Sequence, residues 1–254
     1  MDLADVALLI AAGLAAGGVN AMAGGGSLIS FPALLATGLP PVAANVTNSI
    51  SVCAGYLASV FGSRADLAGQ RRMAAQLIPT TAAGTAAGCA ILLLTPARAF
   101  ELVVPFLVLA AAATLGFQSR LRRVVGHPHD MSPGRRRLYL HLLAGIGSVY
   151  GGYFGAALGV VLVAVLALVL HQSMARITAL KNTLSVTVGL VTVAVFALFG
   201  PVHWVFVAIL TPATLAGGYA GARLARRLPS ERLRWAIVGY GIAIGVLLLV
   251  RAVR

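Results

Sequence analysis

Apolar runs alternate with short polar or Gly/Pro-rich breaks along almost the whole chain. An α-helix needs about 20 apolar residues to cross a typical bilayer. Eight runs are long enough or nearly so, and two, Leu28–Thr37 and Leu158–Leu170, are short. The long runs are Leu3–Met22, Ala43–Phe61, Leu77–Leu94, Phe100–Phe117, Tyr139–Phe154, Ile177–Phe199, Trp204–Leu224 and Trp235–Val253. The pattern predicts an all-α polytopic membrane protein with eight long helices and two short, broken ones.

Composition supports this prediction. The chain has 254 residues, of which 59% are hydrophobic and only 10% are charged. Ordinary soluble domains carry about a quarter charged residues, so lipid is the expected solvent for this apolar surface. The first run follows Asp2 and Asp5 rather than a basic segment, and we interpret it as a retained span rather than a signal peptide. Cys53 and Cys89 sit singly in apolar runs, which favours buried packing over a redox pair or a metal site.

The net charge of +13 comes mainly from arginines that cluster between the apolar runs. These clusters are Arg71 and Arg72, Arg120, Arg122 and Arg123, Arg135 to Arg137, and Arg226, Arg227, Arg232 and Arg234. This distribution is the positive-inside signature of cytoplasmic loops, and it requires no nucleic-acid partner. If all ten runs cross, these loops share one side and the acidic N-terminus lies opposite, although Arg251 and Arg254 then lie outside. If the short runs fail to cross, the 226–234 loop moves outside, against the rule.

The two halves look alike at matching positions, which indicates an internal repeat. Three pairs of motifs match: Gly17-Gly18 with Gly151-Gly152, Thr47-Asn48-Ser49 with Lys181-Asn182-Thr183, and Gly84 and Gly88 with Gly217 and Gly221. Five crossings per half make the repeats inverted, as in many secondary transporters. The predicted organisation is a first transmembrane repeat (1–117), a cytoplasmic basic loop (118–138) and a second transmembrane repeat (139–254).

No carboxylate lies deep in a predicted span. The six acidic residues, all at segment ends or in loops, are Asp2, Asp5, Asp66, Glu101, Asp130 and Glu231. Cation and proton transporters usually place Asp or Glu near the midplane, because a dehydrated cation needs a counter-charge. The distribution therefore argues against a cation as the substrate.

Lys181 is the only lysine, and Asn182 and Thr183 follow it. We expect this triplet and its counterpart, Thr47-Asn48-Ser49, at helix starts, where free N–H groups favour anions. Asn, Ser and Thr side chains add hydrogen-bond donors, so the two triplets together would form a pocket suited to an oxyanion. The alternative is that Lys181 snorkels to the interface and that Thr47 and Ser49 make only interhelical hydrogen bonds.

A glycine-rich break, Gly24-Gly25-Gly26-Ser27, precedes the first short run, which ends near Pro40-Pro41. Unwound backbone at membrane depth must line a cavity or be buried in protein. A short, Gly/Pro-interrupted segment at matching positions of two halves indicates a transport site, so we interpret these glycines as backbone exposed toward a ligand. The second break, Phe154 to Gly159, holds fewer glycines, which predicts an asymmetric site. For Gly84, Gly88, Gly217 and Gly221 we favour close helix packing instead.

The stretch 16–51, AGGVNAMAGGGSLISFPALLATGLPPVAANVTNSIS, resembles the TauE/SafE family of sulfite exporter-like permeases. The Lys181-Asn182-Thr183 triplet and the stretch 217–228, GGYAGARLARRL, also resemble that family. The resemblance implies secondary transport of small anions, mainly sulfur compounds such as sulfite, thiosulfate, sulfoacetate or other organosulfonates. By position, the implied substrate-binding residues are Gly24, Gly25, Gly26, Ser27, Asn48, Ser49, Lys181, Asn182 and Thr183.

Taken together, the sequence predicts a multi-pass permease of the bacterial cytoplasmic (inner) membrane that moves a small anion by alternating access. We expect no catalytic residue, no cofactor and no metal. Protons are one option for a coupling ion, carried by the substrate itself in the case of sulfite, and a homodimer is one option for assembly. A passive anion channel is the nearer rival. An intramembrane hydrolase is the more distant rival, because neither Ser27 nor Ser148 has a histidine well inside a span to serve as a base.

Overall fold

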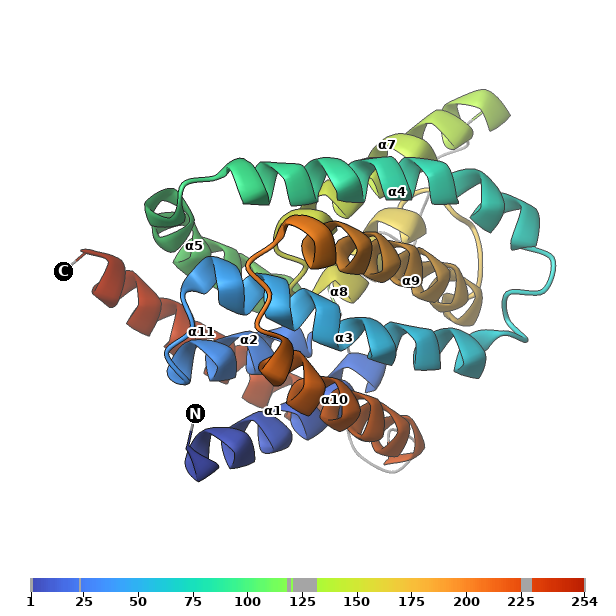
Figure 1. Ribbon diagram of the computed structural model, residues 1–254. Coiled ribbons are helices and arrows are strands. Elements are labelled where there is room, and N and C mark those ends of the chain that lie inside the picture. The colour runs from blue at the N-terminus through green and yellow to red at the C-terminus, as the bar shows by residue number, and fades with distance from the viewer. Residues whose placement is uncertain (1, 23, 118–119, 121–131, 225–229, 254) are drawn as a thin grey trace.

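The computed structural model describes residues 2–22, 24–117, 120, 132–224 and 230–253, which form ten helices and no strand (Figure 1). The helices are α1 (Leu3–Met22), α2 (Ser27–Ala36), α3 (Pro41–Ser63), α4 (Arg71–Leu94), α5 (Ala97–Gly116), α7 (Pro133–Tyr153), α8 (Leu158–Ala167), α9 (Met174–Phe199), α10 (Trp204–Leu224) and α11 (Ser230–Val253). Among them α1, α4, α5 and α9 are long and apolar enough to cross a membrane. Large apolar side chains face outward, as Ile146 and Leu198 do at 67% and 76% exposure. Such a surface suits lipid, and the predicted all-α, polytopic membrane fold is confirmed.

Several helices begin earlier than the apolar pattern predicts. Helix α4 starts at Arg71 rather than Leu77, α9 at Met174 rather than Ile177, and α11 at Ser230 rather than Trp235. Helix α7 starts at Pro133, so the loop predicted over 118–138 ends sooner. Proline is well suited to a first helical turn, because its missing N–H would have no helical partner there. Hydropathy alone misses such polar first turns.

The two short helices are the most enclosed elements of the fold. Seven residues of α2 and seven of α8 are buried out of ten in each helix. Left-handed backbone precedes both helices, at Gly24 (φ 80°) before α2 and at Gly155 (φ 70°) and Ala157 (φ 55°) before α8. Because protein surrounds both helices, their broken ends lie away from lipid, as unwound backbone in a membrane requires.

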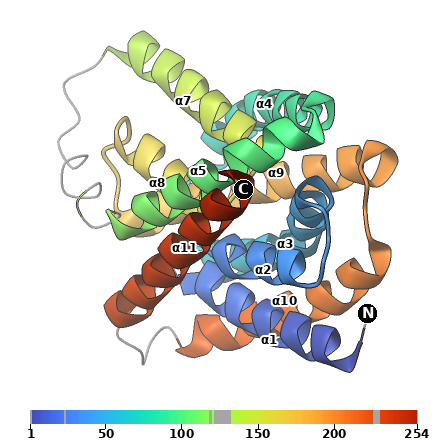
Figure 2. The same cartoon turned by 90° about the vertical axis from the view of Figure 1, so that its left-hand side faces the viewer.

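Helices of the two halves pack on one another in an exchanged pattern. Helix α1 packs on α10 and α4 on α7, so the first helix of each half meets the fourth helix of the other. The third helices, α3 and α9, pack together, and so do the fifth helices, α5 and α11. Figure 2 shows the α4–α7 pair and the α1–α10 pair on opposite flanks of the molecule. The arrangement is the one that a two-fold relation between the halves would produce; the inversion itself stays a prediction.

Glycines allow the flanking pairs to touch through their backbones. A Cβ on Gly17 would lie 2.1 Å from the carbonyl oxygen of Thr214, and one on Gly152 would lie 2.2 Å from that of Thr85. The reverse contacts are as close, 2.1 Å for Gly217 against Leu14 and 2.1 Å for Gly88 against Val149. The close-packing prediction therefore holds for Gly88 and Gly217, whereas the side-chain position of Gly221 lies outside the described residues.

These contacts also favour a different register for the predicted repeat. By its neighbours Gly17 corresponds to Gly152, one residue beyond the Gly151 that the sequence comparison pairs with it. Gly217 corresponds to Gly88 rather than to Gly84, which is one helical turn away. Small residues recur every few positions in these helices, so several registers give comparable glycine matches, and only the contacts distinguish them.

Three described connections of the first half lie on two opposite sides of the molecule. In Figure 1 both chain ends lie toward the left, with the α2–α3 and α4–α5 connections, and the α3–α4 connection lies at the right. Arg64, Arg71 and Arg72 flank the α3–α4 connection, and we call this side the basic side. Arg122, Arg123, Arg226 and Arg227, also predicted there, lie outside the described residues.

Candidate functional site

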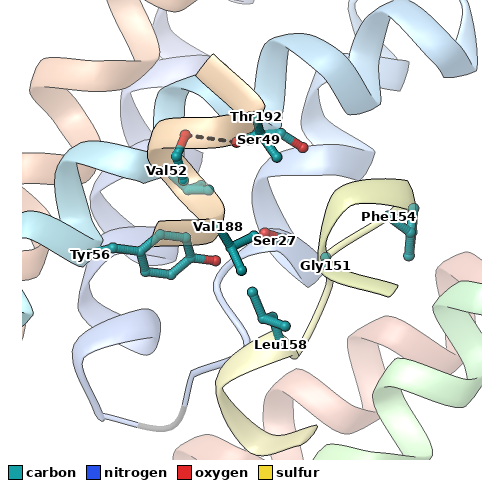
Figure 3. Close-up of a pocket in the computed structure, with 11 residues that line it drawn as sticks. Ser27, Ser49, Val52, Tyr56, Gly151, Phe154, Leu158, Val188 and Thr192 are labelled. Atoms are coloured by element: carbon teal, nitrogen blue, oxygen red, sulfur yellow. Dashed lines mark hydrogen bonds between the residues drawn. The ribbon is translucent and has the colours of Figure 1, made fainter. Parts of the chain in front are cut away.

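A pocket lies where the two broken helix pairs meet the crossing of α3 and α9 (Figure 3). It encloses about 260 Å³ between atoms, its open mouth included. Both halves contribute to its lining: Ser27, Ser49, Val52, Tyr56, Gly151, Phe154, Gly155, Leu158, Val188, Gly189 and Thr192. Four of these side chains carry hydroxyl groups and none carries a charge, so the pocket offers hydrogen bonds without a fixed counter-ion.

Two hairpins of opposite direction frame the pocket. Helices α1 and α2 leave and return to the side of the chain ends, whereas α7 and α8 leave and return to the basic side (Figure 1). The turns of the hairpins meet inside the protein, where a Cβ on Gly24 would lie 3.2 Å from the Cα of Gly159. Glycine suits both positions, because Gly24 has a left-handed φ and because the backbones touch.

The predicted glycine site is only partly in the pocket. Gly24, Gly25 and Gly26 are buried, and a Cβ on each would meet Gly159, Leu115 and Ala16 respectively. None of the three lines the pocket, whereas the next residue, Ser27, does. The exposure of this turn toward a ligand stays a prediction. In the structure Gly24 packs on the second helix break, and Gly25 and Gly26 pack on α5 and α1.

The polar residues of α3 divide between the pocket and the packing. Ser49 lines the pocket and donates from its Oγ to the carbonyl oxygen of Asn45, 2.8 Å away. Asn48 is not among the lining residues, and its Oδ1 accepts a hydrogen bond from the Ser30 hydroxyl of α2 at 2.5 Å. Asn48 thus fastens the short helix to α3. Thr47 accepts a hydrogen bond from the backbone N–H of His203, which joins α3 to the connection between α9 and α10.

The second triplet does not lie at a helix start. Helix α9 begins at Met174, so Lys181 is two turns inside it, and α3 likewise begins at Pro41, well before Asn48. The expectation of free backbone N–H groups at both triplets is wrong, because each helix begins more than one turn before its triplet. Asn182 donates to the Ser59 carbonyl oxygen at 3.2 Å and to the Ser63 hydroxyl at 2.9 Å. Thr183 donates to the Ala179 carbonyl oxygen within α9.

Lys181 is half-buried and reaches toward the helix breaks. Its Nζ lies 3.5 Å from the position that a Cβ on Gly159 would occupy, beside the contact with Gly24. Gly159 belongs to the first turn of α8, where the aligned peptide dipoles of the helix give a partial positive charge. The ammonium group therefore adds to the positive potential at the centre of the fold.

Two hydroxyl-bearing residues of the pocket are not predicted by the sequence. Tyr56 and Thr192 line the pocket, and Figure 3 shows the Tyr56 ring directed toward Ser27, Val188 and Leu158. The Asn20 side chain of α1 lies beside the Tyr56 hydroxyl of α3. The sequence spacing could have identified Tyr56, because Ser49, Val52 and Tyr56 recur every three or four residues and so lie on one face of α3.

Comparison with known proteins agrees with this picture. Residues 9–248 match the family described as "Sulfite exporter TauE/SafE". The "Probable membrane transporter protein" of Haemophilus influenzae is 28% identical over 223 residues, which cover 86% of this chain and 84% of that protein. The "Probable membrane transporter protein YfcA" of Escherichia coli K12 is 27% identical, with 84% and 76% covered. The "Probable membrane transporter protein ORF9" of a Sinorhizobium species is 28% identical, with 96% and 92% covered. No solved structure matches.

Proposed function

This chain belongs to the sulfite exporter TauE/SafE family, and on that premise we propose that it is a secondary transporter that moves a small oxyanion across the bacterial cytoplasmic membrane. Its relatives' names support the broader statement that it is a membrane transporter. The pocket itself is the observation that supports an oxyanion as the substrate. Both halves line it, and its hydroxyl groups come from Ser27, Ser49, Tyr56 and Thr192. No carboxylate is among the lining residues.

The proposed substrates are sulfite, thiosulfate or an organosulfonate such as sulfoacetate. Ser27 would donate a hydrogen bond to the anion, and Ser49 would do so after its hydroxyl turns away from the Asn45 carbonyl oxygen. Lys181 would supply positive potential from beside the helix breaks. The other residues that the sequence assigns to the site would hold the surrounding helices in place rather than contact the anion. Gly24, Gly25 and Gly26 hold the turns together, Asn48 holds α2, and Asn182 and Thr183 bond within the helix frame.

Alternating access follows from the proposed inverted repeat. The exchanged helix partners support a two-fold relation, with α1 on α10 where α7 is on α4. The two hairpins enter from opposite sides and meet at Gly24 and Gly159. Movement of one hairpin at a time relative to the α3–α9 crossing would open the pocket first to one side and then to the other.

A counterflow experiment with matched serine variants tests the proposal. Ser49→Ala and Ser59→Ala each remove an α3 hydroxyl that donates to the carbonyl oxygen one turn back, but only Ser49 lines the pocket. In proteoliposomes loaded with unlabelled sulfite, thiosulfate or sulfoacetate, we expect Ser49→Ala to raise the half-saturation concentration about tenfold. That factor corresponds to roughly 1.5 kcal/mol for a hydrogen bond to a charged group. Ser59→Ala should behave as wild type.

Two results would contradict the proposal. Equal half-saturation for Ser49→Ala and Ser59→Ala would remove the pocket from the transport path. Anion conductance without saturable counterflow would favour a passive channel. Proton coupling is tested in the same vesicles: sulfite flux that ignores an imposed pH gradient would exclude a substrate-borne proton.

A further inference from the structure

One face of α9 leads from the pocket toward the basic side. Thr192 and Val188 line the pocket, and Ser185 and Lys181 follow in steps of three and four residues toward the start of the helix at Met174. Residues at this spacing lie one above another on a single helix face. The lining of the pocket therefore continues as two polar side chains.

Ser185 is a buried donor whose hydrogen bond is unused. Its side chain is 1% exposed, and its Oγ has no hydrogen-bond partner among the described residues. Other buried serines satisfy themselves within their helix, as Ser49 and Ser51 do by donating to Asn45 and Thr47. Buried polar groups without partners are uncommon in folded proteins. The free hydroxyl of Ser185 is therefore available to hydrogen-bond a ligand.

Lys181 lies one turn from Ser185, with its Nζ beside Gly159 and the contact with Gly24. A cation and an unpaired donor on adjacent turns of one helix suit an oxyanion. We propose that Lys181 and Ser185 form a second position for the transported oxyanion, on the basic side of the Gly24–Gly159 contact. The proposal rests on the proposed function, and it adds a step in which the anion is bound at a second site outside the pocket.

The other end of the pocket has a different character. Asn45, Ser49, Val52 and Tyr56 repeat the same spacing on α3, which packs against α9. The residue at the far end, Asn45, is neutral, and its Nδ2 donates to the Tyr153 carbonyl oxygen at the end of α7. Of the two residues that end these rows on α9 and α3, only Lys181 carries a positive charge. We therefore expect the second position only on the basic side.

Thiol labelling tests this position without knowledge of the substrate. Ser185→Cys, in the full chain in membrane vesicles, is treated with an anionic or a cationic methanethiosulfonate reagent, and each rate is divided by that reagent's rate with a free thiol in solution. We expect the anionic reagent to react at least about tenfold faster, because a positive site concentrates anions. Adding Lys181→Gln should abolish the preference. Ser51→Cys, at an equally buried position, is the control and should stay unreactive, as should the buried Cys53 and Cys89.

Equal normalised rates, no labelling at Ser185→Cys, or a preference that survives Lys181→Gln would overturn the proposal. If Ser185→Cys does not purify as a folded protein, Ser185→Ala gives a second test in right-side-out and inside-out vesicles. Uptake of labelled sulfite should then need about tenfold more anion when sulfite is presented at the basic side, and an unchanged value would overturn the proposal. Wild-type counterflow is measured separately, so a chain that labels as expected but carries no oxyanion refutes the proposed function alone.

Discussion

The backbones of Gly24 and Gly159 touch: a Cβ added to either residue would lie 3.2 Å from the Cα of the other. Gly24 precedes α2, and Gly159 lies in the first turn of α8, so the contact joins the broken helices of the two halves. Lys181 flanks the contact, and Ser27 and Leu158, three residues after Gly24 and one before Gly159, line the pocket. This contact therefore fixes how closely the two hairpins approach around the pocket.

Gly24→Ala and Gly159→Ala should both reduce transport. Each added methyl group would meet backbone, which cannot move aside as a side chain can. Gly24→Ala also places alanine at φ 80°, a conformation that costs about 1–2 kcal/mol for a residue with a Cβ. We therefore expect a larger fall in thermal unfolding temperature for Gly24→Ala than for Gly159→Ala, measured in detergent, together with slower counterflow for both.

Gly38→Ala separates the two effects of the Gly24 substitution. Gly38 has φ 87°, but a Cβ there would have nothing within 4 Å. This variant should lose a similar amount of stability through backbone strain and keep normal counterflow. Slow counterflow in Gly38→Ala would show that backbone strain alone accounts for the Gly24 result.

Glycines between the flanking helices should be important for stability. Gly152→Ala would place a methyl group 2.2 Å from the Thr85 carbonyl oxygen, so α4 and α7 would have to separate. Overpacking of this kind typically costs about 1–3 kcal/mol. Gly239→Ala in α11 is the control, since a Cβ there would meet nothing within 4 Å; it should be neutral or stabilising by about 0.5–1 kcal/mol. Unfolding titrations in mixed micelles should rank the two variants, and equal stabilities would contradict the contact.

The sequence pattern predicts much of the fold because membrane helices need long apolar runs. It places both ends of α1 and α10 at the residues where the structure has them, and it identifies α2 and α8 as short. It misplaces the starts of α4, α7, α9 and α11, where the first turns are polar and hydropathy carries no signal. The register that it gives for the predicted repeat differs from the one that the helix contacts favour, because glycine and alanine recur too often to fix one alignment.

The site is less predictable from sequence than the fold. Ser27 and Ser49 are predicted and line the pocket, but Tyr56 and Thr192 also line it and were missed. Which face of a helix turns inward depends on its partners, and those partners lie in the other half of the chain. Asn48 and Asn182 illustrate the difficulty, since the sequence shows polar side chains in apolar runs but does not distinguish a ligand contact from a bond between helices.

Loss of the Ser30–Asn48 hydrogen bond should loosen α2. The Ser30 hydroxyl donates to Asn48 Oδ1, and both residues are at most 1% exposed. Asn48→Ala would leave the Ser30 hydroxyl with only a long contact to the Gly26 carbonyl oxygen, at 3.4 Å. A buried polar group left in this way costs about 1–3 kcal/mol. A double-mutant cycle with Ser30→Ala should show coupling, since each single variant removes the same bond; additive effects would contradict it.

Asn182→Ala decides whether the middle residue of the second triplet binds the anion or holds the frame. Its Nδ2 donates to the Ser59 carbonyl oxygen and to the Ser63 hydroxyl, so it joins α9 to the end of α3. Ser63 keeps a partner in the variant, because its hydroxyl also donates to the Ser59 carbonyl oxygen. We therefore expect a moderate loss of stability, about 1 kcal/mol, and a half-saturation concentration equal to that of wild type. A tenfold rise in half-saturation at unchanged stability would instead place Asn182 at the anion.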